Sequence, residues 1–220
     1  MGTIEELKRL LSASGKSDAE SYFDYFKRIA EILMNNCAIS KDNNRYEIVE
    51  IEFYVFTPDH QDVIVYPRTQ PAGQWFFHPS GVDLTFESNE KQFGGILIRG
   101  VRNIDTGKLT LGPLNCVNIL WDKADAFKIH ENEYPTIVEY SEKFDENICS
   151  FPRWISVKDE KKAKKISDWS NRIIKNGTIL DSNSDKTAIV FTSPYRFIKL
   201  ALIGNTPKGW SGYSARPRVE

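Results

Sequence analysis

The residue whose type and setting best suit catalysis is Glu52, a carboxylate inside the alternating run YEIVEIEFYVF at residues 46–56. Successive side chains of a strand point to opposite faces. Alternation therefore gives one face to Ile48, Glu50, Glu52, Tyr54 and Phe56, and the core face to Val49, Ile51, Phe53 and Val55. Either the first face is the wet side of a half-exposed strand, or Glu52 lies in a pocket where it does chemistry.

Two further charged residues interrupt apolar runs. Asp83 lies early in VDLTFES (82–88), and Arg99 lies in GGILIRGV (94–101). Burying such groups is costly unless they are paired or functional, so Arg99 could form a salt bridge with Glu52 or Asp83. Alternatively, these residues and nearby histidines could form a pocket for a flat polar ring such as a nucleobase, stacked on Tyr54. The residues alone leave both interpretations open.

The segment 57–81 is rich in proline, glycine and aromatic residues, and we expect a long functional loop there. Its candidate side chains are His60, Tyr66, Arg68, Trp75 and His78. In the stretch FFHPSGVD, Asp83 either caps the turn or pairs with Arg99, with His78 as its neighbour. The functional alternative makes His78 and Asp83 the second wall of the pocket.

The overall charge is nearly balanced, which counts against tight non-specific binding of nucleic acid. The 220 residues include 29 Lys and Arg and 30 Asp and Glu, for a net charge of −1 and a pI near 6.3. No global basic field attracts phosphates, although a local basic face is compatible with these numbers. Three widely spaced cysteines and no apolar run near about 18 residues indicate a reducing compartment and no membrane partner. We therefore expect a cytoplasmic monomer.

The sequence contains no P-loop, dinucleotide fingerprint, zincin motif or nucleophile elbow. Only three histidines are present, at positions 60, 78 and 130, so a histidine-rich metal site cannot form. Asp59, His60 and Asp62 could bind a metal in principle, but adjacent loop residues more often cap or solvate. We expect neither a metal nor a cofactor.

The elements that must position these residues indicate one α+β domain over residues 1–220. Helices are expected over residues 3–36, with capping boxes at Thr3 and Glu6 and at Ser17 and Glu20. Strands follow from residue 46, and Gly112-Pro113 opens a further helix. Another helix is expected at 158–175, closing strands at 187–203, and a loose tail at 204–220. The fold class predicted is a curved antiparallel or mixed sheet surrounded by helices, with an N-terminal helical segment at 1–40.

A colinear series of short motifs runs from residue 46 to about residue 200. It comprises VEIEFY, a following DH, RTQPAGQWFFHPSG, a hairpin, GGILIRG, a GP helix start and a late SPYRFIKL. This series resembles the alkyladenine (3-methyladenine) DNA glycosylase family, whose members share V-E-T-E-A-Y, a downstream His, T-P-R-N, V-L-L-R-A, G-P-x-K-L and P-x-R-F. The resemblance implies a glycosylase-like fold for residues 46–203.

The same resemblance implies roles for individual residues. Glu52 matches the carboxylate that activates water, and Tyr54 matches the aromatic on which the extruded base stacks. His60 matches the pocket histidine, and Arg99 matches the arginine that lines the pocket. His78 and Asp83, from the stretch FFHPSGVD, are further substrate-binding candidates.

The DNA contacts implied by the resemblance are less well matched. The family places a Tyr-Gly at the tip of its hairpin to wedge into the duplex, whereas this hairpin reads VDLTFESNEKQFGG. Phe86 or Phe93 would have to replace that tyrosine. Arg68 and Arg196, the latter in the late strand, are the candidate contacts to the DNA backbone.

The activity implied is hydrolysis of the N-glycosidic bond of a damaged purine in double-stranded DNA, with base flipping and without a metal. Two alternatives remain on the same scaffold. One is a non-catalytic module that binds a nucleobase or nucleotide. The other is a hydrolase of free nucleosides, which needs no wedge residue.

Overall fold

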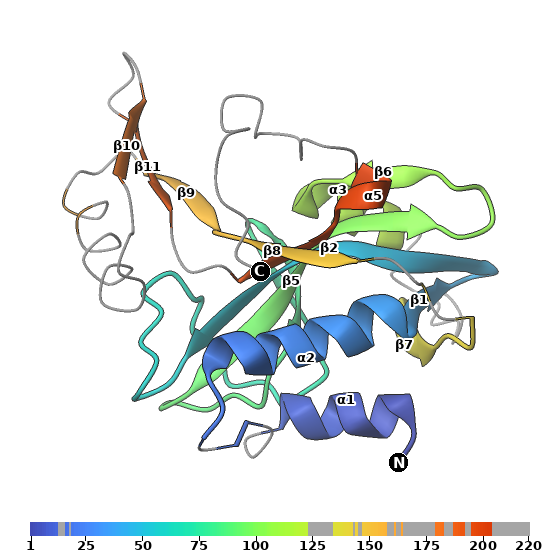
Figure 1. The fold of residues 1–220 in the computed structure, drawn as a ribbon, viewed down its shortest axis with the longest axis horizontal. Helices are drawn as coiled ribbons and strands as arrows, with labels where there is room; N and C mark the ends of the chain where they lie inside the picture. Colours follow the sequence, from blue (N-terminus) through green and yellow to red (C-terminus); the bar gives the residue numbers. More distant parts are fainter. Residues whose placement is uncertain are drawn as a thin grey trace, which may run out of the picture.

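A strongly curved antiparallel sheet forms the body of the molecule, and two helices cover one of its faces (Figure 1). The computed structural model describes residues 1–12, 16–17, 19–122, 134–142, 144, 147–157, 161, 164, 179–182, 187–191 and 195–203. Its helices are α1 (Thr3–Leu11), α2 (Tyr22–Asn35), α3 (Pro113–Leu120) and α5 (Leu200–Ile203). The predicted α+β class, with a curved antiparallel sheet and N-terminal helices, is confirmed.

The sheet contains nine strands, and every pairing among the described residues is antiparallel. Its strands are β1 (Cys37–Lys41), β2 (Asn44–Phe56), β3 (Trp75–His78), β4 (Gly81–Thr85), β5 (Phe93–Asn103), β6 (Leu109–Leu111), β7 (Thr136–Glu139), β8 (Ile148–Phe151) and β12 (Arg196–Lys199). A separate three-stranded sheet is formed by β9 (Trp154–Val157), β10 (Ile179–Ser182) and β11 (Thr187–Phe191). The main order is β3-β4-β5-β2-β1-β7.

Strand β2 lies inside the sheet and pairs with three other strands. One edge pairs with β5 along most of its length. The other edge pairs with β1 at residues 44–47 and with β12 at residues 50–52. The partner changes where the register with β5 shifts, between Ile48 and Ile51.

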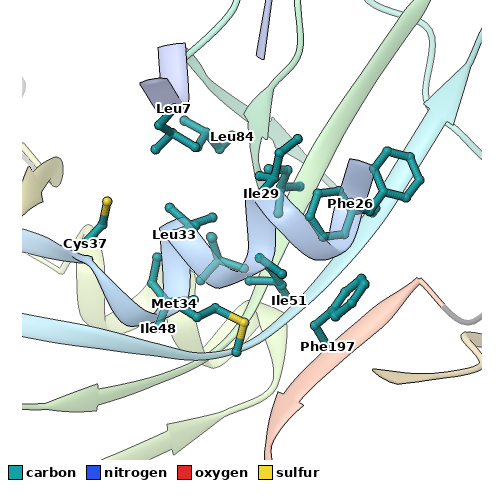
Figure 2. Close-up of a cluster of buried hydrophobic side chains, with 14 of the residues drawn as sticks. Leu7, Phe26, Ile29, Leu33, Met34, Cys37, Ile48, Ile51, Leu84 and Phe197 are labelled. Atoms are coloured by element: carbon teal, nitrogen blue, oxygen red, sulfur yellow. The ribbon is translucent and has the colours of Figure 1, made fainter. Parts of the chain in front are cut away.

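This shift consists of two compensating bulges and corrects the predicted alternation. Val49 is the extra residue on β2, and Arg99 is the extra residue on β5. An extra residue in one strand shifts the alternation of side chains by one position, so the residues before and after the bulge no longer follow a single period of two. Ile48 therefore joins Ile51 in the core against α2, instead of sharing the face of Glu52 (Figure 2).

The N-cap residues of the two N-terminal helices are Gly2 and Ser21, and neither belongs to the capping boxes predicted from the sequence. Helix α1 starts at Thr3 with Gly2 as its N-cap, and the Thr3 hydroxyl instead donates to Glu139. Helix α2 starts after Ser21, whose side chain accepts the backbone N–H of Asp24. A serine N-cap satisfies one of the free N–H groups of the first turn.

The hydrophobic core lies between α1, α2 and one face of the sheet (Figure 2). Apolar residues at helical spacing give α2 a buried stripe of Tyr25, Phe26, Ile29 and Leu33, in which Phe26 is fully buried. The ring of Phe26 stacks on Phe53 at 4.5 Å and meets Tyr195 edge-on at 4.8 Å. This packing fixes which face of β2 is apolar and leaves Glu52 on the opposite face.

Several other predicted boundaries change. The segment expected to be a continuous loop at 57–81 contains β3, which pairs with β4 as an antiparallel hairpin. The Gly112-Pro113 helix start is confirmed as α3, with Pro113 at its first turn. The strand expected to run to residue 203 ends at Lys199, where α5 begins. Most of the helix expected at 158–175, and the tail at 204–220, lie outside the described residues.

Replacing Phe26 with alanine is expected to lower the free energy of unfolding by about 3–5 kcal/mol, because a fully buried aromatic side chain leaves a cavity. Urea denaturation followed by circular dichroism measures this loss. Leu114→Ala is the matched control, because Leu114 is 54% exposed on α3 and should cost about 0.5 kcal/mol or less. Equal losses for the two variants would contradict the placement of the core.

Candidate functional site

The face of the sheet opposite α1 and α2 carries a row of charged side chains. Arg196 on β12 pairs with Glu52 on β2, Glu52 pairs with Leu97 on β5, and Leu97 pairs with Asp83 on β4. Residues paired directly across antiparallel strands project from the same face. Two strand spacings, about 10 Å, therefore separate the backbones of Glu52 and Asp83. The predicted carboxylates share one face but lie in two separate clusters.

Glu52 is 2% exposed and is held by neighbours on three strands. Its Oε2 accepts the Tyr54 hydroxyl at 2.6 Å and Arg99 Nη1 at 3.1 Å. Its Oε1 lies 3.7 Å from Arg196 Nε. Tyr54 and Arg99 are themselves only partly buried. The carboxylate thus lies beneath two side chains that reach the surface.

The electrostatics of this cluster keep Glu52 ionised. Burial raises the pKa of Glu52, but Arg99, Arg196, the Tyr54 hydroxyl and Arg153 together hold it below its ordinary value of 4.5. Burial and the adjacent Glu52 raise the pKa of Tyr54 well above 10.0. At neutral pH the site therefore contains a buried carboxylate beside a neutral phenol that donates to it.

The bulge on β5 aims Arg99 at two of the three carboxylates of β2, those of Glu50 and Glu52. Its Nε donates to Glu50 Oε1 at 2.8 Å, while Nη1 reaches Glu52. The backbone oxygen of Arg99 accepts the N–H of Gly112 at 2.7 Å. Gly112, whose φ of 97° lies in the region that favours glycine, is the N-cap of α3. The Gly-Pro helix start thereby anchors the residue that pairs with Glu52.

Charge pairing continues along the same face in both directions. Arg196 approaches Glu50 Oε1 at 2.6 Å through Nη2 and 2.9 Å through Nε. Glu47, fully buried, accepts Lys199 at 2.7 Å and is also paired with Arg102. Breaking one member of a buried ion pair leaves an uncompensated charge, so these contacts depend on one another.

Arg153 is a site residue that sequence reasoning missed. It is fully buried, its Nη1 donates to Phe53 O at 2.6 Å and to Asp62 Oδ2 at 2.8 Å, and its guanidinium lies 4.5 Å from the Tyr54 ring. The sequence signal was weak, since FPRWIS shows an arginine between apolar residues but not its partners. One face of the Tyr54 ring is therefore covered, and only the other face can stack on a ligand.

The structure does not place His60 beside Glu52. His60 is 3% exposed, and its ring packs 4.2 Å from Tyr22, on the side of the sheet covered by α2. Its Nδ1 contacts Val55 O at 2.9 Å and its Nε2 contacts the Tyr195 hydroxyl at 3.1 Å. Burial lowers the pKa of His60 below 6.5. A neutral histidine with both nitrogens engaged is a packing residue of the core.

The second cluster joins Asp83 to two residues of the preceding segment. Asp83 accepts His78 Nε2 at 2.9 Å, and its other oxygen lies 2.7 Å from Arg68 Nη1. Its predicted partner Arg99 pairs with Glu50 and Glu52 instead. The His78 ring lies 4.7 Å from that of Tyr66 and 5.9 Å from that of Phe76. His78 and Asp83 therefore form a wall on the same face as Glu52.

Three of the residues expected to touch DNA are buried in this structure, whereas Phe93, the other candidate wedge, is partly exposed. Phe86 is 6% exposed and packs against Tyr25, Phe26 and Phe53 in the core. Arg68 is 5% exposed and paired with Asp83, and Arg196 is 1% exposed and paired with Glu50. A side chain that wedges into a duplex or neutralises phosphates must reach the surface.

Two hollows lie elsewhere, on the side of the N-terminal helices. One, of about 320 Å³, is lined by α1 together with Trp75, Leu84 and Ile137. The other, of about 220 Å³, is lined by Lys16, Tyr22 and the ends of β2 and β5. Within the described ranges, no group of three His, Cys, Asp or Glu could hold a metal ion. No described helix is long and apolar enough to cross a membrane.

The described chain is thus an α+β protein that packs one face of its sheet with apolar side chains and the other with paired charges. No family model matches this chain, and no solved structure matches it. An uncharacterized protein of Acanthamoeba polyphaga mimivirus is 31% identical over an alignment of 147 residues, which covers 56% of this chain and 67% of the viral protein. The chain belongs to the same protein family as this viral protein.

Glu52→Gln is expected to be destabilising at pH 7 and to differ less from the wild type in acid. The pKa of Glu52 is lowered in the folded state, so its ionised form stabilises the protein above about pH 4.5, and this contribution is lost as the pH falls further. Urea denaturation at pH 7, 5, 4 and 3.5 measures the difference in free energy of unfolding between variant and wild type.

Glu31→Gln provides the control, because Glu31 is exposed on α2 and outside the charged face. Its difference from the wild type should stay small at every pH. A Glu52→Gln difference that stays constant from pH 7 to pH 3.5 would show that the native state does not favour the ionised carboxylate.

Proposed function

We propose that this protein hydrolyses the N-glycosidic bond of a purine, with Glu52 as the residue that acts on the attacking water. The observation that carries the proposal is a 2%-exposed carboxylate held ionised beneath two partly exposed side chains, Tyr54 and Arg99. The colinear motifs that resemble the alkyladenine DNA glycosylase family support the same reaction. Under this proposal the curved sheet and α3 represent a diverged form of that family's fold.

The chemistry follows from the charge of Glu52. A water oxygen attacks the sugar carbon while the bond between that carbon and the purine nitrogen breaks. The electrons of the broken bond leave with the purine. The transition state resembles an oxocarbenium ion, and a buried carboxylate stabilises this positive charge more strongly than one in water. Glu52 accepts the proton of the attacking water.

The neighbours of Glu52 have separate roles. The Tyr54 hydroxyl, which stays protonated, fixes Oε2 of the carboxylate. Among the described residues, the closest ion-pair contact of Oε1 is Arg196 Nε at 3.7 Å. This oxygen is the one proposed to face the water. Arg153 covers one face of the Tyr54 ring, so the purine would stack on the opposite face.

One observation favours the alternative of a free nucleoside or base as ligand. Three of the side chains expected to contact duplex DNA, Phe86, Arg68 and Arg196, are buried. A small ligand needs no wedge and no phosphate-binding surface, and the near-neutral net charge of −1 suits it. The assay therefore includes duplex and nucleoside substrates side by side.

Glu52→Gln is expected to lower the rate of base release by about 10²–10⁴-fold, because it removes the group that accepts the proton. The measurement is single-turnover release of purine from duplexes containing hypoxanthine, ethenoadenine or 3-methyladenine, and from the matching free nucleosides. Each variant is first shown to be folded at the assay temperature by circular dichroism.

Two further variants separate catalysis from folding. Glu31→Gln should leave the rate unchanged, since Glu31 is exposed on α2 away from the site. Glu52→Asp keeps the charge but moves the carboxylate by about one methylene, and we expect an intermediate loss of rate. Full activity of folded Glu52→Gln would refute the assignment, and purine binding without release from any substrate would identify a binding module.

A further inference from the structure

Arg68 carries a buried hydrogen-bond donor for which the described residues provide no acceptor. Its side chain is completely buried, and its Nε donates to Tyr66 O at 3.1 Å. Nη1 lies 2.7 Å from Asp83 Oδ2 as an ion pair, and Nη2 has no hydrogen-bond partner among the residues that the structure describes. A buried N–H without a partner is costly, and in native proteins it commonly marks a site that a ligand or water completes.

The guanidinium lies in the row of side chains that leads to Tyr54. Its Nη1 occupies the position that a Cβ on Gly95 would need, and such a Cβ would also lie 2.7 Å from Asp83. Gly95 pairs directly with Tyr54 on β2. Arg68 and Tyr54 therefore project from the same face one strand apart, and only glycine at position 95 leaves room for the guanidinium.

Arg68 is held in one plane by contacts on several sides. Phe76 stacks 4.1 Å from the guanidinium carbon, Asp83 fixes one edge, and the Tyr66 carbonyl fixes Nε. An arginine held in this way presents its donors in a fixed direction, unlike a mobile surface arginine. Such a donor discriminates between ligands because the unbound state has no freedom to adapt.

We infer that Arg68 reads the acceptor edge of the purine and selects 6-oxopurines over 6-aminopurines. This inference rests on the proposed function. A 6-oxopurine such as hypoxanthine presents the acceptors O6 and N7 on this edge, and Nη2, the nitrogen that Asp83 and Tyr66 leave open, can donate to them. Adenine presents an amino donor in place of O6, and that donor would oppose the N–H groups of Arg68.

Charge balance favours a neutral acceptor over a phosphate at this position. The positive charge of Arg68 is already compensated by Asp83. An anion at Nη2 would lie close to that buried carboxylate and be repelled by it. A carbonyl oxygen satisfies the donor without adding a charge.

The test is equilibrium binding of the free bases hypoxanthine and adenine, measured by isothermal titration calorimetry on the full chain. The wild type should bind hypoxanthine about 5- to 150-fold more tightly than adenine. Arg68→Lys keeps the positive charge facing Asp83 but loses the separate nitrogen Nη2 that faces the base, so the two bases should bind within about twofold of each other. Arg102→Lys, the same exchange at a pair with Glu47, should retain the wild-type preference.

A second variant guards against misfolding of Arg68→Lys. Arg68→Met combined with Asp83→Asn removes both charges of the pair together, so no buried charge is left alone. It should also lose the preference for hypoxanthine.

Each outcome is decisive. Equal binding of the two bases by the wild type, or a preference that survives in a folded Arg68 variant, overturns the role of Arg68. Base release in the Glu52 assay, whatever the preference, keeps the proposed function. Failure to bind either base, together with no base release, overturns both proposals.

Discussion

The pairing of two adjacent β2 carboxylates, Glu50 and Glu52, with Arg99 and Arg196 is the interaction on which the rest of the structure depends. Removing four charges from water costs several kcal/mol per ion unless each is paired at close range. Arg99 comes from β5 and Arg196 from β12, on opposite edges of β2. The register of three strands is therefore fixed by the requirement that these groups meet.

The irregular features of the sheet serve this requirement. In a regular β5 strand, Arg99 would be paired with a single residue of β2. Because Arg99 is the extra residue of the bulge, its side chain reaches both Glu50 and Glu52. Gly100 lies opposite the bulge on β2, and a Cβ there would lie 3.0 Å from both Glu50 and Val49. The N–H of Gly112 satisfies the carbonyl that the bulge frees. The regular strand pairing is interrupted at Val49 and Arg99, and contacts at the same place satisfy the groups that the interruption leaves unpaired. Such local departures from regular structure are expected at functional sites.

The sequence predicted the features that depend on local pattern. Period-two alternation identified Glu52 and Tyr54 as neighbours on one face, and the Gly112-Pro113 pair identified the start of α3. It failed where long-range packing decides. The bulge at Val49 moved Ile48 to the core, and α2 covered the loop end that carries His60. Arg153 and Asp62 are 91 positions apart, so no local pattern could reveal their pairing. Phe86 resembled an exposed hairpin residue only because its aromatic neighbours on α2 are distant in the chain.

The division of the sheet into an apolar and a charged face also bears on the choice of substrate. Hydrophobic side chains would stabilise a buried sheet face at least as well as ion pairs, because replacing buried ion pairs by hydrophobic residues often leaves the free energy of unfolding unchanged or raises it. Here Tyr54 and Arg99 reach the surface from a network that is otherwise buried, and the Arg68 donor finds no acceptor in the part of the chain that the structure describes. The described arginines of this face, Arg68, Arg99, Arg153 and Arg196, are each paired with a carboxylate, so a polyanion gains little from them. A flat, neutral ligand with acceptors on its edge satisfies both the open donor and the aromatic surface, which is why we place the recognition of a purine base, and not of the DNA backbone, at the centre of the proposed function.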